Sequence, residues 1–102
     1  MKTIYYFTAD WCSPCKRTKP IVADLMREQT EAGFQIIDAD SEIELVKKFD
    51  IRSIPTFILF HDGVEKKRVT GAQTREQLMG LIKYEETIEE DIQSWWEKYD
   101  SR

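Results

Sequence analysis

The sequence predicts an α/β fold in which a mixed four-stranded sheet carries helices on both faces. Segments of strand-like and helix-like periodicity alternate along the chain in the order β-α-β-α-β-β-α. A strand–helix–strand crossover requires parallel pairing, whereas the tight turn between the last two strands requires antiparallel pairing. The chain has 102 residues, of which 41% are hydrophobic, so it can bury one modest core.

The first predicted strand covers residues 4–8. It is rich in β-branched and aromatic residues and is apolar on both faces, as expected for a central, buried strand. Residues 9–13 form the following turn, and Pro14 suits the first turn of a helix. Pro20 lies inside this helix, where we expect a kink, and Gly33 ends the region. Apolar residues recur in the helix at helical spacing: Ile21, Val22, Leu25 and Met26.

The second strand is predicted at residues 34–39. Ser41 and Glu44 have the spacing of a capping box, which predicts the start of a short helix. That helix is expected to bury an apolar set on one side: Ile43, Val46 and, as a further candidate, Phe49.

The second half of the domain is predicted to contain a hairpin and a final helix. Strands at residues 56–60 and 64–70 flank the turn formed by residues 61–63. Thr74 and Gln77 offer a second capping box, and helical spacing continues through Leu78, Leu81 and Ile82. We therefore place a single domain at residues 1–82, followed by a helical extension at residues 83–102.

Charge and composition exclude several classes of protein. The net charge of −4 lies entirely in residues 83–102, which hold three basic and seven acidic residues, so there is no basic stripe for nucleic acid. No apolar run approaches the roughly 20 residues of a membrane span. The N-terminus lacks the features of a signal peptide, and we expect a cytoplasmic location. Two cysteines are too few for a disulfide-stapled secreted scaffold.

The two cysteines are three residues apart, in Trp-Cys-Ser-Pro-Cys between the first strand and its helix. In the first turn of a helix this spacing puts their Cα atoms roughly 5.5 Å apart, within disulfide geometry. Cys12 lies at the positive end of the helix dipole, which lowers its pKa, and Cys15 is expected to be more buried. We therefore predict that Cys12 attacks a substrate disulfide and that Cys15 resolves the mixed disulfide. Pro14 stiffens the turn, and Trp11 offers a flat apolar wall to a polypeptide substrate.

Two other interpretations of this pair are weaker. The cysteines could be two small apolar residues of one helix, but the flanking Trp11 and the intervening Pro14 argue against chance. A zinc site needs four ligands, and only His61 and scattered carboxylates are available besides the two thiols. His61 is interpreted as a solvated turn residue. No metal ligand is predicted.

Residues 3–82 resemble the thioredoxin family. The resemblance rests on five motifs in the correct order: Trp11 to Lys16 as the active site, with Ser13 where Gly is usual; Pro20; the loop from Ile51 to Thr56, which contains Ile54 and Pro55; Asp62-Gly63; and Gly71-Ala72. It implies a cis Pro55 that faces the dithiol and exposes the backbone of Ile54 to an extended substrate. It also implies a shallow substrate groove around Cys12, lined by Trp11, Ser13, Pro14, Ile54, Gly71 and Ala72.

The chain departs from the family pattern in three ways. The usual leading strand and helix are missing, and Thr8 stands where a Trp is common. Tyr6 replaces the buried Asp that takes the proton of the second thiol, and Ile36 stands at the position of its Lys companion. Removing a buried anion near the dithiol favours the thiolate, so we expect Tyr6 and Lys16 to tune the pair, with a lower Cys12 pKa and a weaker reductant.

The short N-terminus is also similar to glutaredoxins, but the glycine pair and acid that help those proteins hold glutathione are replaced by Gly71-Ala72-Gln73. The resemblance implies a protein disulfide reductase without a bound cofactor. Its electrons would come from NADPH through a thioredoxin reductase-type or glutathione-linked partner. Two alternatives stay open: a glutaredoxin-like or weakly oxidising dithiol protein, and a non-redox binding subunit. We expect a monomer, with a dimer through the last helix as an alternative.

Residues 83–102 lie beyond the resemblance. An apolar stripe with an acidic opposite face predicts an amphipathic helix that packs on, or continues, the last helix of the domain; its members are Leu81, Ile88, Ile92, Trp95 and Tyr99. Such a helix is marginal alone, so its stripe must dock. We favour docking on the chain's own sheet, with a dimer or a partner that contacts Trp95 and Trp96 as alternatives.

Overall fold

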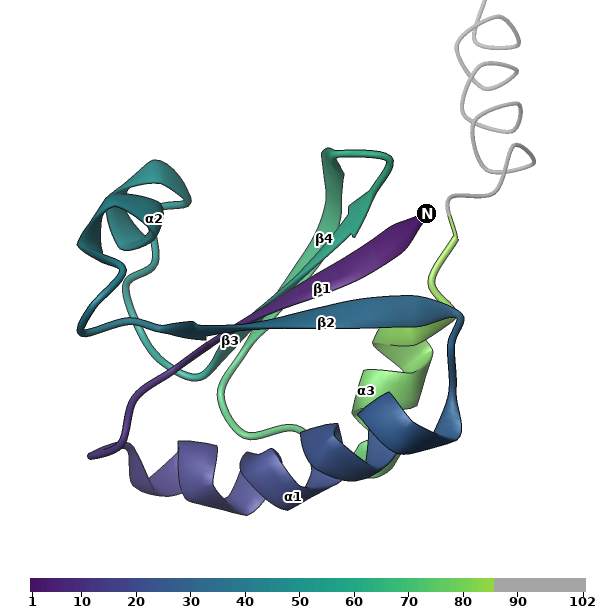
Figure 1. Cartoon of the computed structure of the whole chain (residues 1–102), viewed down its shortest axis with the longest axis horizontal. Coiled ribbons are helices and arrows are strands. Elements are labelled where there is room, and N and C mark those ends of the chain that lie inside the picture. The colour runs from purple at the N-terminus through teal and green to yellow at the C-terminus, as the bar shows by residue number, and fades with distance from the viewer. Residues whose placement is uncertain (86–102) are drawn as a thin grey trace, which may run out of the picture.

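The computed structural model describes residues 1–85 and contains one four-stranded sheet and three helices in this part of the chain (Figure 1). The strand order is β2-β1-β3-β4; β1 pairs with β2 in parallel, and the other two pairs are antiparallel. The mixed sheet and the element order are therefore confirmed. The elements are β1 (Lys2–Thr8), α1 (Ser13–Glu28), β2 (Ala32–Asp38), α2 (Ile43–Lys48), β3 (Thr56–His61), β4 (Val64–Thr70) and α3 (Arg75–Ile82).

Strand β1 is the central strand and carries the site. Tyr6 pairs with Ile36 of β2 on one side and with Phe57 of β3 on the other. Because backbone hydrogen bonds hold β1 on both edges, the loop that follows it and contains Cys12 has a firm base.

Helices α1 and α3 cover one face of the sheet (Figure 1). Both helices bury their apolar faces against side chains of β1 and β3. This larger core contains Ile4, Tyr6, Val22, Leu25, Ala32, Phe57, Leu59, Leu78, Leu81 and Ile82. The predicted buried positions of α1 and α3 are thereby confirmed at Val22, Leu25, Leu78, Leu81 and Ile82.

The opposite face of the sheet carries α2. Phe7, Ile37 and Ile58 are buried there, and Leu45 and Val46 of α2 pack against them. A cluster of rings closes this core: Tyr5 lies edge-on to Phe49 and tilted against Phe60, with centroids 5.8 and 4.7 Å apart.

The start of α3 is the capping box predicted from the sequence. The Thr74 hydroxyl accepts a 3.1 Å hydrogen bond from the backbone N–H of Gln77, and the Gln77 side-chain oxygen accepts one of 2.8 Å from the Thr74 N–H. These bonds satisfy two backbone donors that have no partner within the helix. Helix α1 runs without a break through Pro20.

The start of α2 differs from the prediction. The N-cap residue is Glu42, without a side-chain capping bond, because Ser41 belongs to the preceding turn and its hydroxyl donates to the Asp38 carbonyl. Helix α2 begins one residue later than the predicted capping box requires. Ile43, predicted to be buried, is 54% exposed, and it is Leu45 and Val46 that pack on the sheet. Gly33 was expected to end the region before the second strand but lies inside β2, paired with Thr3.

Helix α3 ends at Ile82, and Tyr84 and Glu85 follow outside any helix. The buried side chain of Lys2 donates a 2.9 Å hydrogen bond to the carbonyl of Ile82, one of the last acceptors of the helix. Residues 83–85 therefore do not continue α3, and the helix predicted further along the tail lies outside the described residues. Within residues 1–85 no helix is long and apolar enough to span a membrane.

Candidate active site

The dithiol lies where the loop after β1 turns into α1. Cys12 and Cys15 form a disulfide, and their Cα atoms are 5.2 Å apart, as the predicted helical spacing requires. Cys12 is the N-cap of α1, and its Sγ accepts a 3.2 Å hydrogen bond from the backbone N–H of Cys15. Pro14 occupies the first turn, where no intrahelical N–H bond is lost. The sulfur of Cys12 thus faces the positive end of the helix.

The surroundings of the two sulfurs differ more than their exposure. Cys12 is 3% and Cys15 2% exposed in this disulfide form, so the expected greater burial of Cys15 is not seen. Cys12 Sγ lies 3.8 Å from the carbonyl oxygen of Ile54, on the side of the surface loops. Cys15 lies on the inner side, above Tyr6 and beside a groove. The two sulfurs therefore differ in their neighbours and not in their exposure.

Three loops that are distant in the sequence meet at Cys12. The Ile54–Pro55 peptide is cis, as the resemblance implied, and Ile54 packs against both cysteines. The backbone N–H of Gly71 donates a 2.8 Å hydrogen bond to the Pro55 carbonyl. Gly71 has a φ of 87°, a backbone conformation that favours glycine. The structure thus brings Ile54 to the dithiol and joins Gly71 to the next residue, Pro55; exposed Ala72 follows Gly71.

Trp11, the residue before Cys12, is 66% exposed. Its indole Nε1 donates a 2.9 Å hydrogen bond to a carboxylate oxygen of Asp40. This bond fixes the ring without burying it. Asp40 was not predicted from the sequence, because it lies 29 residues away in the turn after β2 and no spacing rule links it to Trp11.

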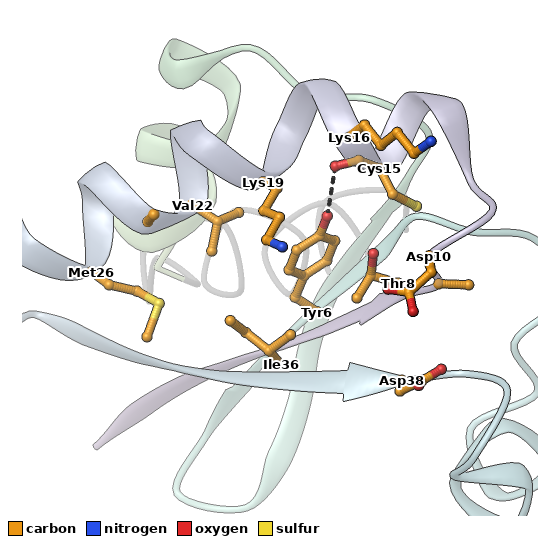
Figure 2. A pocket seen from close by; sticks show the side chains of 12 residues that line it. Tyr6, Thr8, Asp10, Cys15, Lys16, Lys19, Val22, Met26, Ile36 and Asp38 are labelled. Carbon is orange, nitrogen blue, oxygen red and sulfur yellow. Dashed lines mark hydrogen bonds between the residues drawn. The ribbon is translucent and has the colours of Figure 1, made fainter.

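Tyr6 lies directly beneath α1. Its hydroxyl donates a 3.2 Å hydrogen bond to the carbonyl oxygen of Cys15 (Figure 2). Its ring stacks on Phe57, with centroids 4.6 Å apart. Burial raises the pKa of the Tyr6 phenol. Because the pKa lies above its ordinary value near 10, Tyr6 is a neutral donor at physiological pH. The side chain under the second thiol therefore brings no charge.

A groove of about 420 Å³ opens between α1 and the edge of β2 and reaches Cys15 from behind (Figure 2). Its floor is apolar, and Lys16 and Lys19 project from α1 at its wall. The groove is lined by Tyr6, Thr8, Ala9, Asp10, Cys15, Lys16, Lys19, Val22, Ala23, Met26, Ile36 and Asp38. Tyr6 and Lys16, which were expected to tune the dithiol, share this groove with Ile36, and no sequence pattern predicted that they would.

The sequence around this dithiol matches a known protein family. The family model described as Thioredoxin matches residues 1–84.

The chain belongs to the thioredoxin family.

Its relatives include mitochondrial thioredoxin-2 of Schizosaccharomyces pombe, which is 36% identical over 84 residues, or 82% of this chain and 63% of that protein. Chlamydia trachomatis thioredoxin is 37% identical over 76 residues, or 74% of each chain. A mutant thioredoxin from Halobacterium salinarum has the same fold, with a TM-score of 0.77 and 38% identity over 85% of this chain and 77% of that one. The chain thus spans under two thirds of the fungal relative's length.

Thioredoxins are thiol–disulfide oxidoreductases, and this chemistry requires two cysteines that can form a disulfide, as Cys12 and Cys15 do. The family acts on protein disulfides and receives electrons from NADPH through a thioredoxin reductase. Its chemistry resides in the sulfurs and needs no bound cofactor.

A metal site does not compete with the dithiol in the described part of the chain. Within residues 1–85 there is no group of three or more histidine, cysteine or acidic side chains that could hold a metal ion. His61 is a half-exposed turn residue whose Nε2 lies 3.8 Å from a carboxylate oxygen of Asp62. His61 is the last residue of β3, at the opposite end of the strand from Thr56, and it lies far from Cys12.

Proposed function

We propose that this thioredoxin-family chain reduces protein disulfides, with Cys12 as the nucleophile and Cys15 as the resolving thiol. The carrying observation is the position of Cys12 Sγ, which caps α1, accepts the Cys15 N–H at 3.2 Å and faces the surface loops near Ile54. A backbone N–H and a helix N-terminus favour thiolate over thiol, so they lower the pKa of Cys12 in the reduced protein.

The reaction then follows from the geometry. The Cys12 thiolate attacks one sulfur of the substrate disulfide, and the other substrate sulfur leaves as a thiolate that takes a proton from water. The thiolate of Cys15, one helical turn away, next attacks Cys12 Sγ. The Cys12–Cys15 bond forms as the mixed disulfide breaks and the second substrate sulfur leaves. Two electrons pass to the substrate, and α1 needs no rearrangement because the Cα atoms are already 5.2 Å apart.

The substrate lies against the loops around Cys12. Trp11 offers an exposed ring held by Asp40, and Ile54 places its carbonyl oxygen 3.8 Å from Cys12 Sγ. An extended polypeptide can pair with the backbone of Ile54 and contact Gly71 and Ala72, in the manner of an added strand. Such a mode recognises backbone, which suits a reductase of many protein disulfides.

Cysteine replacement tests the assignment of roles. Cys15→Ser is expected to accumulate a mixed disulfide between Cys12 and a disulfide-bonded reporter protein, visible by mass spectrometry, because resolution is blocked. Cys12→Ser is expected to form no such adduct and to have no reductase activity. An adduct through Cys15 in Cys12→Ser at a comparable rate would reverse the roles. Full biological activity after replacement of both cysteines would favour the non-redox binding subunit.

We propose that Tyr6 sets the reduction potential of the Cys12–Cys15 couple. Since this neutral side chain stands under Cys15 where the family has a carboxylate, no buried negative charge opposes the Cys12 thiolate. A thiol with a lower pKa stabilises the reduced pair, so this protein should be a weaker reductant than thioredoxins that keep the acid.

A pH titration of the thiolate absorbance measures the pKa of Cys12 and so tests this role of Tyr6. Tyr6→Asp is expected to raise the pKa of Cys12 and to make the couple more reducing. Tyr6→Phe, which is neutral and of matching shape, is the control and should leave the pKa unchanged. A Cys12 pKa that is the same in Tyr6→Asp and in the natural chain would remove Tyr6 from this role.

The electron donor is proposed to be a thioredoxin reductase that uses NADPH, acting in a reducing compartment such as the cytoplasm. The proposal follows from the direction of the reaction, because a reductase must be returned to its dithiol form. Turnover of the reporter protein with NADPH and thioredoxin reductase, compared with glutathione and glutathione reductase, identifies the donor. Faster turnover with glutathione would favour the glutaredoxin-like alternative.

A further inference from the structure

The groove behind Cys15 contains two large apolar side chains that are exposed to solvent. Met26 from α1 is 45% exposed and Ile36 from β2 is 52% exposed, and they lie on opposite walls (Figure 2). Within residues 1–85, β2 is an edge strand with no neighbour on its outer side. The groove is therefore open along this edge, and covering it would bury apolar surface.

The described part of the chain ends beside the start of β1, where Tyr84 and Glu85 line a small pocket with His61 and Lys66. Glu85 Oε1 lies 3.8 Å from the ammonium of Lys2, the first residue of β1. Lys2 pairs with Ala32, the first residue of β2. The next residues of the chain thus start at the end of the sheet where β2 begins, one strand away from the open edge.

The remaining chain has a suitable length. The α1 wall of the groove runs from Met26 to Cys15, which corresponds to about 17 Å at roughly 1.5 Å per residue. Residues 86–102 would measure about 26 Å as a helix by the same rule. They can therefore cross to the edge of β2 and still extend along the whole groove.

The sequence of this segment fits the groove in pattern and in charge. Ile88, Ile92, Trp95 and Tyr99 recur at spacings of three and four, which gives one apolar face. Its basic residues, Lys98 and Arg102, both lie in the last five positions. A helix that enters at the Met26 end would bring them to the other end of the groove, which Asp10 and Asp38 border.

We propose that residues 86–102 dock as an amphipathic helix in the groove of their own chain, with the apolar face against Met26 and Ile36. Docked there, the segment covers the inner side of Cys15 and leaves Cys12 and its loops open to substrate. Substrate proteins can then approach the dithiol only from the side of Cys12. This inference concerns a separate surface, so it stands or falls independently of the reductase assignment.

Hydrogen exchange on the full chain tests the docking. An isolated helix of this length is marginal, so its amides are protected only when the apolar face is docked. Ile36→Glu is expected to speed amide exchange in residues 86–102 at least tenfold and to shift tryptophan emission to the red, because Trp95 becomes solvated. Ile43→Glu is the matched control: Ile43 is equally exposed, at 54%, but lies on α2 on the other face, so the tail should be unaffected. Met26→Glu provides a second groove variant.

Three results would overturn the proposal. Fast exchange of residues 86–102 in the natural chain would show that the segment does not dock. Protection that survives both Ile36→Glu and Met26→Glu would place it elsewhere. Protection that falls on dilution, together with a dimer mass in analytical ultracentrifugation, would assign the groove to the tail of a second copy.

Discussion

The hydroxyl of Tyr6 lies 3.2 Å from the carbonyl oxygen of Cys15 and donates a hydrogen bond to it. The bond joins the central strand of the sheet to the first turn of the helix that carries both cysteines. Tyr6 is also stacked on Phe57 of the neighbouring strand. One buried side chain thus supports the dithiol from below through a polar contact and an aromatic contact.

Removing this hydroxyl should destabilise the protein. In Tyr6→Phe the Cys15 carbonyl loses a buried donor, and we expect the free energy of unfolding to fall by about 1 kcal/mol, a typical value for such a bond. Urea titration of the oxidised protein measures the change. Tyr5→Phe, on the opposite face of the sheet, is the control and should cost less. Equal losses in both variants would mean that the bond to Cys15 contributes nothing specific.

Freeing the Trp11 ring should weaken the action on protein substrates. Asp40→Ala removes the acceptor of the indole N–H, so the exposed ring loses its fixed orientation. We expect kcat/KM for a disulfide-bonded protein to fall about threefold, equivalent to roughly 0.7 kcal/mol, with no change in the pKa of Cys12. Steady-state kinetics gives the comparison, with Glu42→Ala as the nearby control. An equal loss on a small-molecule disulfide would show that Asp40 acts on the thiols instead.

Loss of the capping box of α3 should lower the stability of the protein without changing its reductase activity. Thr74→Ala removes the hydroxyl that accepts the Gln77 N–H, and a lost N-cap costs about 1 kcal/mol. Thr74→Ser keeps the oxygen and should lose much less. Thermal unfolding of the three proteins is sufficient, and reductase activity at low temperature should be the same in all of them. An alanine variant as stable as the natural chain would contradict the prediction.

An ion pair on β4 should contribute to stability in a pH-dependent way. Hydrogen bonds of 2.8 and 2.7 Å from Arg68 hold the pKa of the Glu65 carboxyl below its usual value. A lowered pKa in the folded state gives a contribution that is present above the unfolded pKa, near 4.5, and is lost as the pH falls through the folded pKa.

Glu65→Gln is therefore expected to flatten the stability profile below about pH 5. At pH 7 its cost should stay under about 1 kcal/mol, because the pair is partly exposed to solvent. Urea titrations from pH 3 to about pH 7 measure both effects, with Glu44→Gln as a control outside the pair. A profile parallel to that of the natural chain would exclude this contribution.

Most of the fold was predictable because its signals are local. The β-branched and aromatic run of β1, the turn at Asp62-Gly63 and the pairing of Thr74 with Gln77 each need only a few neighbouring residues. The start of α2 was mispredicted because the pattern competes with another local structure. Asp38 accepts bonds in the turn after β2 and engages Ser41 there, so the expected cap was not available.

The site was predictable to the extent that a known motif carries it. Cys12, Cys15, Pro55 and Gly71 follow from short motifs, and the structure brings them together. The partners that come from tertiary contacts could not be found in this way. The bond from Trp11 to Asp40, the bond from Tyr6 to the Cys15 carbonyl and the shared groove arise only when β1, β2 and α1 are packed.

The position of Cys12 as the N-cap of α1 links the chemistry to the folding equilibrium. A thiolate is a stronger acceptor for the Cys15 N–H than a disulfide sulfur, since charge-assisted hydrogen bonds are roughly twice as strong as neutral ones. Each turnover therefore alters the quality of the cap at the start of the helix. The unfolding free energies of the reduced and oxidised forms and the reduction potentials of the folded and unfolded couples then belong to one thermodynamic cycle. Two unfolding curves therefore report how far the fold shifts the reduction potential of the dithiol from its value in the unfolded chain.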